Sequence, residues 1–431
     1  MTDVVKDGSG SPLVRMFAEQ LVRKQQTSNG GAVVKAEAST EMSRVRNPSG
    51  IAASLDNAER AIRELGIVFR FDEFRQRVVC DGLDTHLGVT MEDIVLHVRR
   101  AVIQKFGFDP EQNHTRDAIR ILARENSFNP VLNYIDAQQW DGVPRIDNWL
   151  SVYLGAQDNP LNRAFGRAFL IAGVRRARRP GCKFDYVLVL EGQQGRGKSS
   201  ALKIIAGGED FFSDEIVIGQ GSKETQELLQ GKWIVELPEL VGLRSADIRG
   251  IKQFVSKTVD RARGAFQKSV EELPRRCIFA GTTNDAQYLK DPTGNRRFWP
   301  VATGKIDLVT LAEARHQLWA EAAAAEPDAP DPITIPESLW AAAAERQAER
   351  FASDPWEDIL ERKLPETAHR VSSELRIPTH AIFESCLGME FGSASRRDML
   401  RLGECMRRLG WDGPRPFRVG GALEKGYVKE G

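Results

Sequence analysis

The sequence predicts an α/β protein whose central sheet is largely parallel. Between residues 140 and 321, short apolar segments typical of buried strands alternate with segments of helical apolar spacing. A glycine-rich loop joins one of these strands to a helix, and two later strands end in carboxylate or amide side chains. Open α/β sheets bind ligands at the carboxyl ends of their strands, so these features predict a ligand site at that edge.

The composition argues against several classes of protein. Lys and Arg total 60, as do Asp and Glu, and the resulting net charge of zero is unlike that of a histone-like or acidic-tail protein. Without a run of eighteen apolar residues or a signal-like N-terminus, we expect no membrane association. The 5 cysteines contain no C-x-x-C pair, which predicts reduced thiols in the cytoplasm. The histidines lack the spacing of zinc ligands.

The N-terminal third divides into a leader and a small domain. Residues 1–50 are rich in Gly, Ser, Thr, Lys and Glu, a composition that predicts a flexible leader. Residues 51–135 predict a small helical or mixed accessory domain, with a helix at 56–65, a strand pair at 68–79 and helical spacing over 90–124. No catalytic pattern occurs in this domain.

The centre of the chain is predicted to be a nucleotide-binding core over residues 136–325. The segment 322–336 contains four prolines that interrupt the alternating pattern. We therefore expect a linker or surface excursion there, followed by an Ala-rich helix, within residues 326–355.

Residues 356–431 predict a C-terminal helical module. Two helical segments, 378–387 and 395–409, precede a short β excursion that contains Gly-Gly, an order that suggests a winged-helix-like fold. From residue 391 onward the chain carries nine Arg and Lys against five Asp and Glu. This local excess favours contact with DNA, whereas a helical cap that docks on protein is the alternative.

The glycine-rich loop at 192–199 reads G-x-x-x-x-G-K-S, after the apolar run 186–190 and before a helix-like segment. Glycines allow the backbone to wrap around phosphates, and the N–H groups that open a helix face the anion. We expect Lys198 to reach the β- and γ-phosphates and Ser199 to bind Mg²⁺. A chance glycine-rich turn is the alternative, which the flanking strand and helix disfavour. The predicted nucleotide-binding residues are Gly192, Gln194, Gly195, Arg196, Gly197, Lys198, Ser199 and Ser200.

A second strand-like segment, GKWIVELPE, ends in two carboxylates, Glu236 and Glu239. If this strand neighbours the loop-bearing strand, Glu236 would hold Mg²⁺ directly or through water. Glu239 would then orient the attacking water. The alternative is an edge strand with two solvated glutamates.

Two further segments supply polar groups. The strand-like 276–280 leads into Gly-Thr-Thr-Asn-Asp, where Asn284 would contact the γ-phosphate or the water, unless the Asn-Asp pair only forms a turn. Arg296 and Arg297 follow on a loop that contains glycine. An arginine supplied by a neighbouring subunit would neutralise transition-state charge, while a surface pair bonded to a nearby Asp is the alternative.

A polar segment lies between the acidic strand and the Asn284 strand. It includes Thr258, Asp260, Arg261, Arg263 and Lys268. One interpretation has it facing a central channel, where it contacts a nucleic-acid backbone; the other is a solvated hairpin.

The order GQQGRGKS, WIVELPEL, IFAGTTN and DPTGNRRFWPV resembles the virulence-associated protein E family, which comprises phage- and prophage-linked ATPases related to superfamily 3 helicases and viral primase-helicases. Flanking segments such as WDGVPRIDNWL and DPWEDIL extend the resemblance over about 126–360. It implies an AAA+-like P-loop NTPase core that uses ATP and Mg²⁺ and assembles as a homo-oligomeric ring, a hexamer, on DNA. It also implies the site roles, which fall on Lys198, Ser199, Glu236 (metal), Glu239 (base), Asn284 (sensor), and Arg296 and Arg297 (arginine finger).

The leading hypothesis is an ATP- and Mg²⁺-dependent ATPase that translocates on single-stranded DNA as a helicase in phage or mobile-element replication, with replication proteins as further partners. The alternative is a regulatory or interaction protein that uses ATP binding as an assembly switch, recruits replication machinery or interferes with it, and does not unwind DNA. A small-molecule kinase is less favoured, because no acceptor-binding or lid segment is evident. We do not predict primer synthesis, because the roughly 130 residues before the core contain no paired acidic metal motif.

Overall fold

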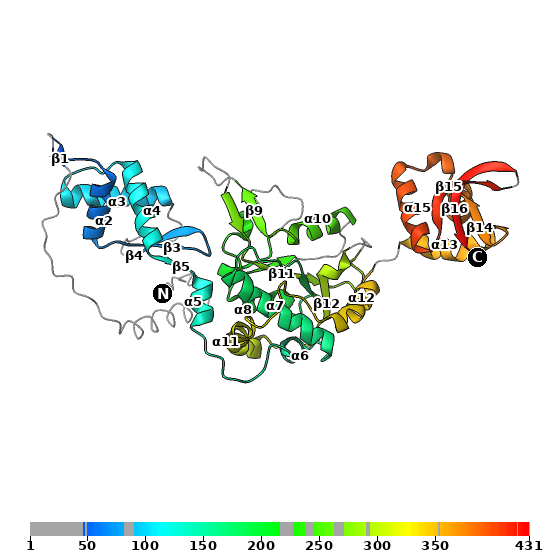
Figure 1. Cartoon of the computed structure of the whole chain (residues 1–431), viewed down its shortest axis with the longest axis horizontal. Helices are drawn as coiled ribbons and strands as arrows, with labels where there is room; N and C mark the ends of the chain where they lie inside the picture. The colour runs from blue at the N-terminus through cyan, green and yellow to red at the C-terminus, as the bar shows by residue number, and fades with distance from the viewer. Residues whose placement is uncertain are drawn as a thin grey trace, which may run out of the picture. The chain divides into compact units, whose positions relative to one another are not determined.

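The computed structural model describes most of the chain, and the predicted leader falls almost wholly outside the described residues. The described parts belong to two compact units, the first drawn from Met1–Leu240, Gly250–Asp285 and Arg296–Ala344 and the second from the remainder (Figure 1). Within these parts no helix has the length and apolarity needed to cross a membrane. The described ranges are 46–47, 50–81, 90–215, 227–237, 245–262, 271–289, 294–351, 354–419 and 421–430.

A five-stranded parallel sheet forms the centre of the first unit, which confirms the predicted α/β class. Strands β6, β8 and β11 are buried along their whole length, as expected for parallel strands covered on both faces. In spatial order the strands are β12 (Phe298–Ala302), β6 (Val187–Glu191), β11 (Ile278–Thr283), β8 (Ile234–Leu237) and β7 (Phe212–Ser213).

The lateral order of the strands corrects one expectation. The acidic strand β8 does not neighbour the loop-bearing strand β6, because β11 lies between them and pairs with both. From β6 the chain continues to β7 at the far edge of the sheet and then to β8, which lies beside β7. The position between β8 and β6 is filled later in the chain by β11. Since all five strands are parallel, their carboxyl ends still share one edge of the sheet.

Helices cover the two faces of this sheet. On one face, Gly173 of α7 lies against Trp319 of α11 and Ile278 of β11, and its carbonyl accepts a hydrogen bond from the Trp233 indole at 3.0 Å. On the other face, the ring of Phe254 packs 5.2 Å from that of Phe279. The first face carries α7 (Pro160–Arg178), α8 (Lys198–Ala206) and α11 (Leu308–Ala325), and the second carries the end of α10 (Ser245–Val255).

The predicted linker is only partly a surface excursion. Its first residues, 322–325, complete α11, and Ile333 and Ile335 are buried in the main core. The carboxylate of Glu326 is also buried and accepts a 2.6 Å hydrogen bond from Arg175 of α7. These contacts fix the segment against the core before η3 (Glu337–Leu339) and α12 (Trp340–Glu349).

The N-terminal part of the first unit has its own small core. Three helices pack on a three-stranded sheet of order β4-β3-β5, with Ile62, Val98 and Ile119 fully buried between them. The helix at 56–65, the strand pair and the helical spacing over 90–124 are thereby confirmed. The elements are α2 (Leu55–Leu65), β3 (Val68–Asp72), β4 (Arg77–Asp81), α3 (Met91–Phe106), α4 (Gln112–Glu125), β5 (Ser127–Phe128) and α5 (Pro130–Asp136), after a short hairpin of β1 (Arg46–Asn47) and β2 (Gly50–Ile51).

The turn between β3 and β4 contacts the body of the parallel sheet. Arg75 forms an ion pair with Asp210 at 3.2 Å, and its guanidinium lies 4.5 Å from the centre of the Phe211 ring. Phe74 is buried in the main core. Asp72 stabilises the turn by accepting hydrogen bonds from the backbone N–H groups of Phe74 and Arg75.

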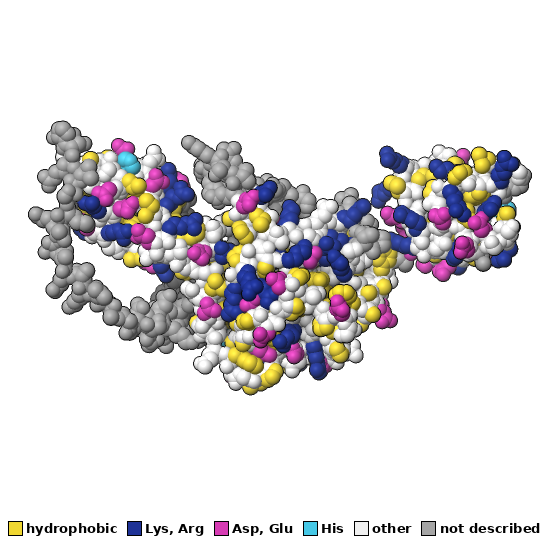
Figure 2. Space-filling view, viewed as in Figure 1, with side chains coloured by type: hydrophobic (Ala, Val, Ile, Leu, Met, Phe, Trp, Pro, Cys, Tyr) yellow, Lys and Arg dark blue, Asp and Glu magenta, His cyan; other side chains and the backbone are white. Residues whose placement is uncertain are grey.

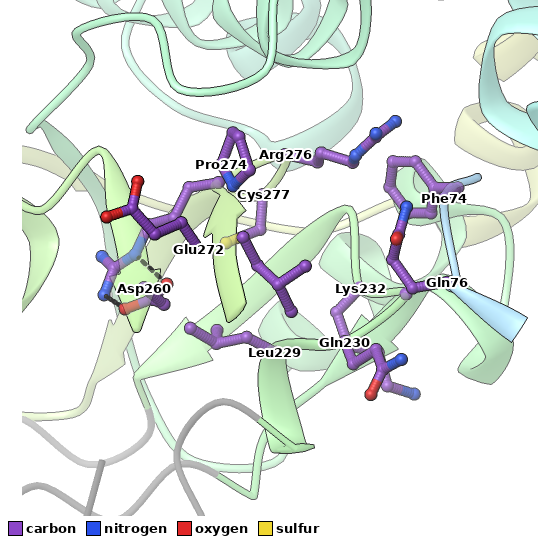
Figure 3. Close-up of a pocket in the computed structure, with 13 residues that line it drawn as sticks. Phe74, Gln76, Leu229, Gln230, Lys232, Asp260, Glu272, Pro274, Arg276 and Cys277 are labelled. Atoms are coloured by element: carbon purple, nitrogen blue, oxygen red, sulfur yellow. Dashed lines mark hydrogen bonds and ion pairs between the residues drawn. The ribbon is translucent and has the colours of Figure 1, made fainter. Parts of the chain in front are cut away.

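A cavity of about 160 Å³ lies beside this turn (Figure 3). Phe74 and Gln76 line it from the turn, while the residues that precede β8 and β11 line it from the sheet. It therefore lies at the amino edge of the sheet, opposite the edge that carries the glycine-rich loop.

The second unit ends in a four-stranded antiparallel sheet of order β13-β14-β16-β15, packed on helices around Trp356, Leu360 and Tyr427. The helix predicted at 395–409 is confirmed, and a capping box of Ser395 and Asp398 starts it. The segment predicted as the other helix is one short turn followed by π-helical geometry. The elements are α13 (Pro355–Thr367), β13 (His369–Val371), β14 (Glu374–Pro378), α14 (Thr379–Ala381), η4 (Ile382–Cys386), η5 (Phe391–Ser393), α15 (Arg396–Arg408), β15 (Asp412–Val419) and β16 (Ala422–Glu430).

Candidate nucleotide site

The glycine-rich loop connects the carboxyl end of β6 to the first residue of α8. Gly197 caps the helix with a φ of 86°, a conformation that other residues adopt only with strain. At Gly192 a side chain would begin 2.7 Å from the Thr303 hydroxyl. Glycine at these two positions lets the loop turn tightly, and the free N–H groups of the first turn of α8 face the loop.

Lys198 closes the loop from the inside. Its Nζ donates hydrogen bonds to the carbonyl oxygens of Gly192 at 2.6 Å and Gln193 at 2.9 Å. Burial lowers the pKa of this lysine, and the nearby charge of Glu236 opposes part of that effect. An ammonium held by two loop carbonyls can exchange them for the oxygens of a bound phosphate.

Glu236 of β8 accepts two hydrogen bonds on one of its carboxylate oxygens. The Ser199 hydroxyl donates to Oε1 at 2.8 Å, and the Thr282 hydroxyl of β11 donates to the same atom at 2.5 Å. The other oxygen, Oε2, is buried without a hydrogen-bond partner, and the side chain as a whole is 1% exposed. Burial raises the pKa of this carboxyl, and hydrogen bonds from Thr282 and Ser199 partly counteract the rise.

These groups surround one cavity of about 400 Å³ at the carboxyl edge of the sheet. The structure thus brings the loop, Glu236 and the exposed Asn284 together, as the sequence predicted. Glu239 lies outside the described residues. The lining residues are Gln194, Gly195, Arg196, Gly197, Lys198, Ser199, Ser200, Glu236, Thr282, Thr283 and Asn284.

The two predicted arginines do not join this cavity. They form η2 (Asn295–Arg297), directly before β12, whose first residue is level with Val187 at the start of β6. They therefore lie at the amino edge of the sheet, about 16 Å of strand length from the loop. Arg297 donates from Nε to Asp185 at 3.1 Å and to Ser256 at 3.0 Å, whereas Arg296 is exposed.

The polar segment before β11 forms an antiparallel hairpin of β9 (Val259–Ala262) and β10 (Glu271–Pro274). Asp260 does not face outward as a free group, because Arg275 donates to both of its carboxylate oxygens, at 2.6 and 2.8 Å. Arg261 pairs with Glu272 across the hairpin at 2.8 Å. Arg263 and Lys268 lie outside the described residues, so the two interpretations of this segment stay open.

Sequence reasoning missed two side chains near Glu236. Thr282 belongs to a quoted motif but received no role. Because Ala280 is paired with Glu236, the two-residue period of a strand puts Thr282 on the Glu236 face. The sequence shows the period of this strand but not its pairing with β8, so it could not place Thr282 beside Glu236. Asp214 follows β7, and a strand of two residues leaves no periodic pattern to detect.

Comparison with known proteins supports the architecture first. At 12% identity, the chain is similar to the A form apo structure of the NrS-1 C-terminal region, with a TM-score of 0.50, over 88% of this chain and 100% of that one. A second apo structure of the same region gives 13% identity and a TM-score of 0.49 over 87% and 98%. Such identities concern the fold alone, here a mixed α/β protein with a parallel sheet.

The family follows from the sequence itself. Residues 135–352 match the virulence-associated protein E-like domain, and the chain belongs to that family. No curated protein matches the chain. The matched residues contain β6, α8, β8 and β11, and hence every described residue that lines the 400 Å³ cavity.

Proposed function

We propose that the protein is an ATP- and Mg²⁺-dependent ATPase that translocates on DNA and acts as a helicase in phage or mobile-element replication. The observation that carries the proposal is the meeting of Lys198, Ser199 and Glu236 at one cavity. Membership of the virulence-associated protein E-like family supports the link to phage replication. The fold supports it further, because the cavity lies at the carboxyl edge of a parallel sheet.

In this proposal the core is a P-loop NTPase of the AAA+-like, superfamily 3 type. The phosphates of ATP take the place of the Gly192 and Gln193 carbonyls at the Lys198 ammonium, while the N–H groups of the loop and of the start of α8 bind phosphate oxygens. Mg²⁺, held by the Ser199 hydroxyl and Glu236, supplies neutralisation of charge on the β- and γ-phosphates. The partnerless Oε2 of Glu236 supports this assignment, since a buried carboxylate oxygen requires a partner.

Hydrolysis is an in-line displacement at the γ-phosphorus. Asn284 and Glu239 hold the attacking water, whose oxygen forms a bond to phosphorus while the bond to the β–γ bridging oxygen breaks. Glu239 accepts the proton of the water, and ADP and phosphate leave. The place of Asn284 at the cavity wall supports its part in this scheme.

The position of the arginines supports an assembled site. Neither Arg296 nor Arg297 can reach the loop of its own chain across about 16 Å of strand. In a homo-oligomeric ring, proposed here as a hexamer, the amino edge of one subunit would face the phosphate site of the next. Arg296 is the better candidate for that role, because Arg297 is held by Asp185 and Ser256 in its own chain.

Two parts of the chain are candidates for DNA contact. In the sequence, the segment between β9 and β10 contains Arg263 and Lys268. The helices α13 and α15 beside a four-stranded antiparallel sheet support the proposal of a winged-helix-like module in the C-terminal unit. There α15 begins with two exposed arginines, Arg396 and Arg397, and the β15–β16 hairpin carries Arg418. Such cations contact the phosphate backbone without reading sequence.

The test compares Lys198→Ala with Lys203→Ala, a matched change on α8 at a partly exposed lysine that pairs with Glu209. Wild type and Lys203→Ala should show DNA-stimulated ATP hydrolysis and strand displacement, and Lys198→Ala should show neither. A mass measurement with an ATP analogue and single-stranded DNA should give a closed ring. ATP binding by the wild type without stimulation or unwinding would favour the ATP-binding regulatory protein instead.

A further inference from the structure

We propose that Asp214 supplies a second carboxylate to the divalent-cation site formed by Glu236 and Ser199. The proposal rests on the proposed function and deepens it. It assigns a role to a residue that follows the edge strand β7, outside the glycine-rich loop and the acidic strand.

The register of the sheet brings Asp214 beside Glu236. In the β7–β8 ladder, Phe212 pairs with Ile234 and Ser213 with Val235. Asp214 directly follows the last pair, and continuing the register by one residue places it at the level of Glu236. Adjacent strands lie about 4.8 Å apart. Phe212 and Ile234 both join the main core, on the sheet face covered by α8, and the two-residue period returns positions 214 and 236 to that face. In agreement, the charge of Asp214 is near enough to act on the Glu236 carboxyl.

An independent observation indicates that this place takes a cation. Both hydroxyl donors, Ser199 and Thr282, donate to Oε1 of Glu236, which leaves Oε2 buried without a partner at the wall of the cavity. A second carboxylate beside a partnerless carboxylate oxygen is electrostatically unfavourable, because like charges repel and the buried carboxylate of Glu236 is poorly screened by water. A divalent cation removes both costs, since it gives Oε2 a partner and neutralises the pair.

The kind of cation follows from the donors. Within the described parts of the chain, no three His, Cys, Asp or Glu side chains are grouped to hold a metal ion. Two carboxylates and a hydroxyl do not complete a protein cage, but they suit Mg²⁺, which is bound through one or two carboxylates, waters and substrate phosphates. Glu236 is buried and Asp214 exposed, so the pair offers one inner ligand and one group that accepts hydrogen bonds from the water shell of the cation.

The test uses Asp214→Asn and, as control, Glu215→Gln, which removes an equally exposed charge one residue further on. Mn²⁺ binding to the nucleotide-free protein is measured by electron paramagnetic resonance. Binding of a non-hydrolysable ATP analogue is measured by calorimetry, first in EDTA and then at increasing Mg²⁺. We expect Asp214→Asn to weaken Mn²⁺ binding and to raise the half-saturating Mg²⁺ concentration about tenfold, the effect of about 1.4 kcal/mol. Its affinity for the metal-free analogue should stay equal or increase, and Glu215→Gln should match the wild type.

Unchanged Mn²⁺ and Mg²⁺ dependence in Asp214→Asn would overturn the proposal, as would a loss of turnover with normal cation affinity, because Asp214 would then act on the water or the fold. Equal weakening in Glu215→Gln would also overturn it, by reducing the effect to general surface charge. A wild type that binds Mn²⁺ through Asp214 but no ATP analogue would contradict the proposed function and leave the cation site standing.

Discussion

Replacement of Glu236 by Gln should make the metal-free protein more stable while abolishing hydrolysis. The side chain is buried, one carboxylate oxygen accepts hydrogen bonds from Ser199 and Thr282, and the other has no partner. Gln has nearly the same shape and keeps an acceptor for both hydroxyls. The substitution therefore removes mainly the negative charge that burial disfavours.

The magnitude and the pH dependence follow from this arrangement. Burial raises the pKa of Glu236 above 4.5, so the folded protein holds the proton more tightly than the unfolded chain. This contribution to stability is present at low pH and is lost as pH rises through the raised folded pKa. A partnerless buried polar group costs about 1–3 kcal/mol, and the amide retains part of that cost, so we expect a gain of about 1 kcal/mol at about pH 8. In a unit of this size the melting temperature should rise by about 1–2 °C, with the gain vanishing near pH 4.5.

Thermal unfolding in EDTA at several pH values measures the effect. The control is Glu321→Gln, because Glu321 is equally buried but accepts from the backbone N–H groups of Arg145 at 2.6 Å and Ile146 at 3.0 Å. Loss of these charge-assisted hydrogen bonds should lower the stability by about 1 kcal/mol. With an ATP analogue and Mg²⁺, wild type should gain more stability than Glu236→Gln. A Glu236→Gln protein that melts below wild type in EDTA at pH 8 would refute the reasoning.

The remaining predictions concern the arginines. Rings of Arg296→Ala subunits and rings of Lys198→Ala subunits should each lack ATP turnover. Mixed rings should regain part of the turnover, because some interfaces then combine an intact lysine and an intact arginine from different chains. No recovery on mixing would exclude a trans arginine. Arg275→Met should destabilise the protein by about 3–5 kcal/mol in thermal unfolding, because it leaves Asp260 unpaired in a nearly buried site, and adding Asp260→Asn should restore part of the loss. Arg75→Ala should speed hydrogen exchange at 209–213 by several-fold, because it removes an ion pair and a cation–π contact that together contribute about 1 kcal/mol. Unchanged exchange would show that the turn does not stabilise β7.

The conformation of the glycine-rich loop was predictable because its signal is local. Eight consecutive residues specify the turn, and the apolar run before Gly192 and the helix after Lys198 supply its context. Glu236 was also expected near Ser199, on the assumption that its strand is next to the loop-bearing strand. The strand order contradicts that assumption. A sequence shows where strands end, whereas their lateral order depends on contacts between distant segments, so the insertion of β11 between β6 and β8 was not visible. Glu236 nevertheless lies beside Ser199, because parallel strands share a carboxyl edge.

Other features were hidden by competing signals. The four prolines of 322–336 predicted a linker, yet Ile333 and Ile335, two residues apart, both enter the core. Their spacing is typical of an extended segment with one buried side. Prolines are compatible with such a segment when it lies outside a sheet, because its backbone N–H groups then need no partner strand. Asp214 gave no signal at all, because its role depends on the register between two strands about twenty residues apart in the chain.

Some of the basic residues counted in the C-terminal module form ion pairs within the module. The nine cations after residue 391 outnumber the carboxylates of that stretch, but two of them are paired with acids at the start of α13. Arg401 donates to Asp354, which caps the helix, and Arg408 donates to Glu357, each at 2.6 Å. Arg415 lies near acids as well. These ion pairs stabilise the module, and substitution of their arginines would disturb its packing whether or not the module binds a partner. If the module binds DNA, the exposed arginines that open α15 are therefore better candidates for its phosphate contacts than the arginines already paired with acids. The zero net charge of the whole chain has no bearing on such local contacts.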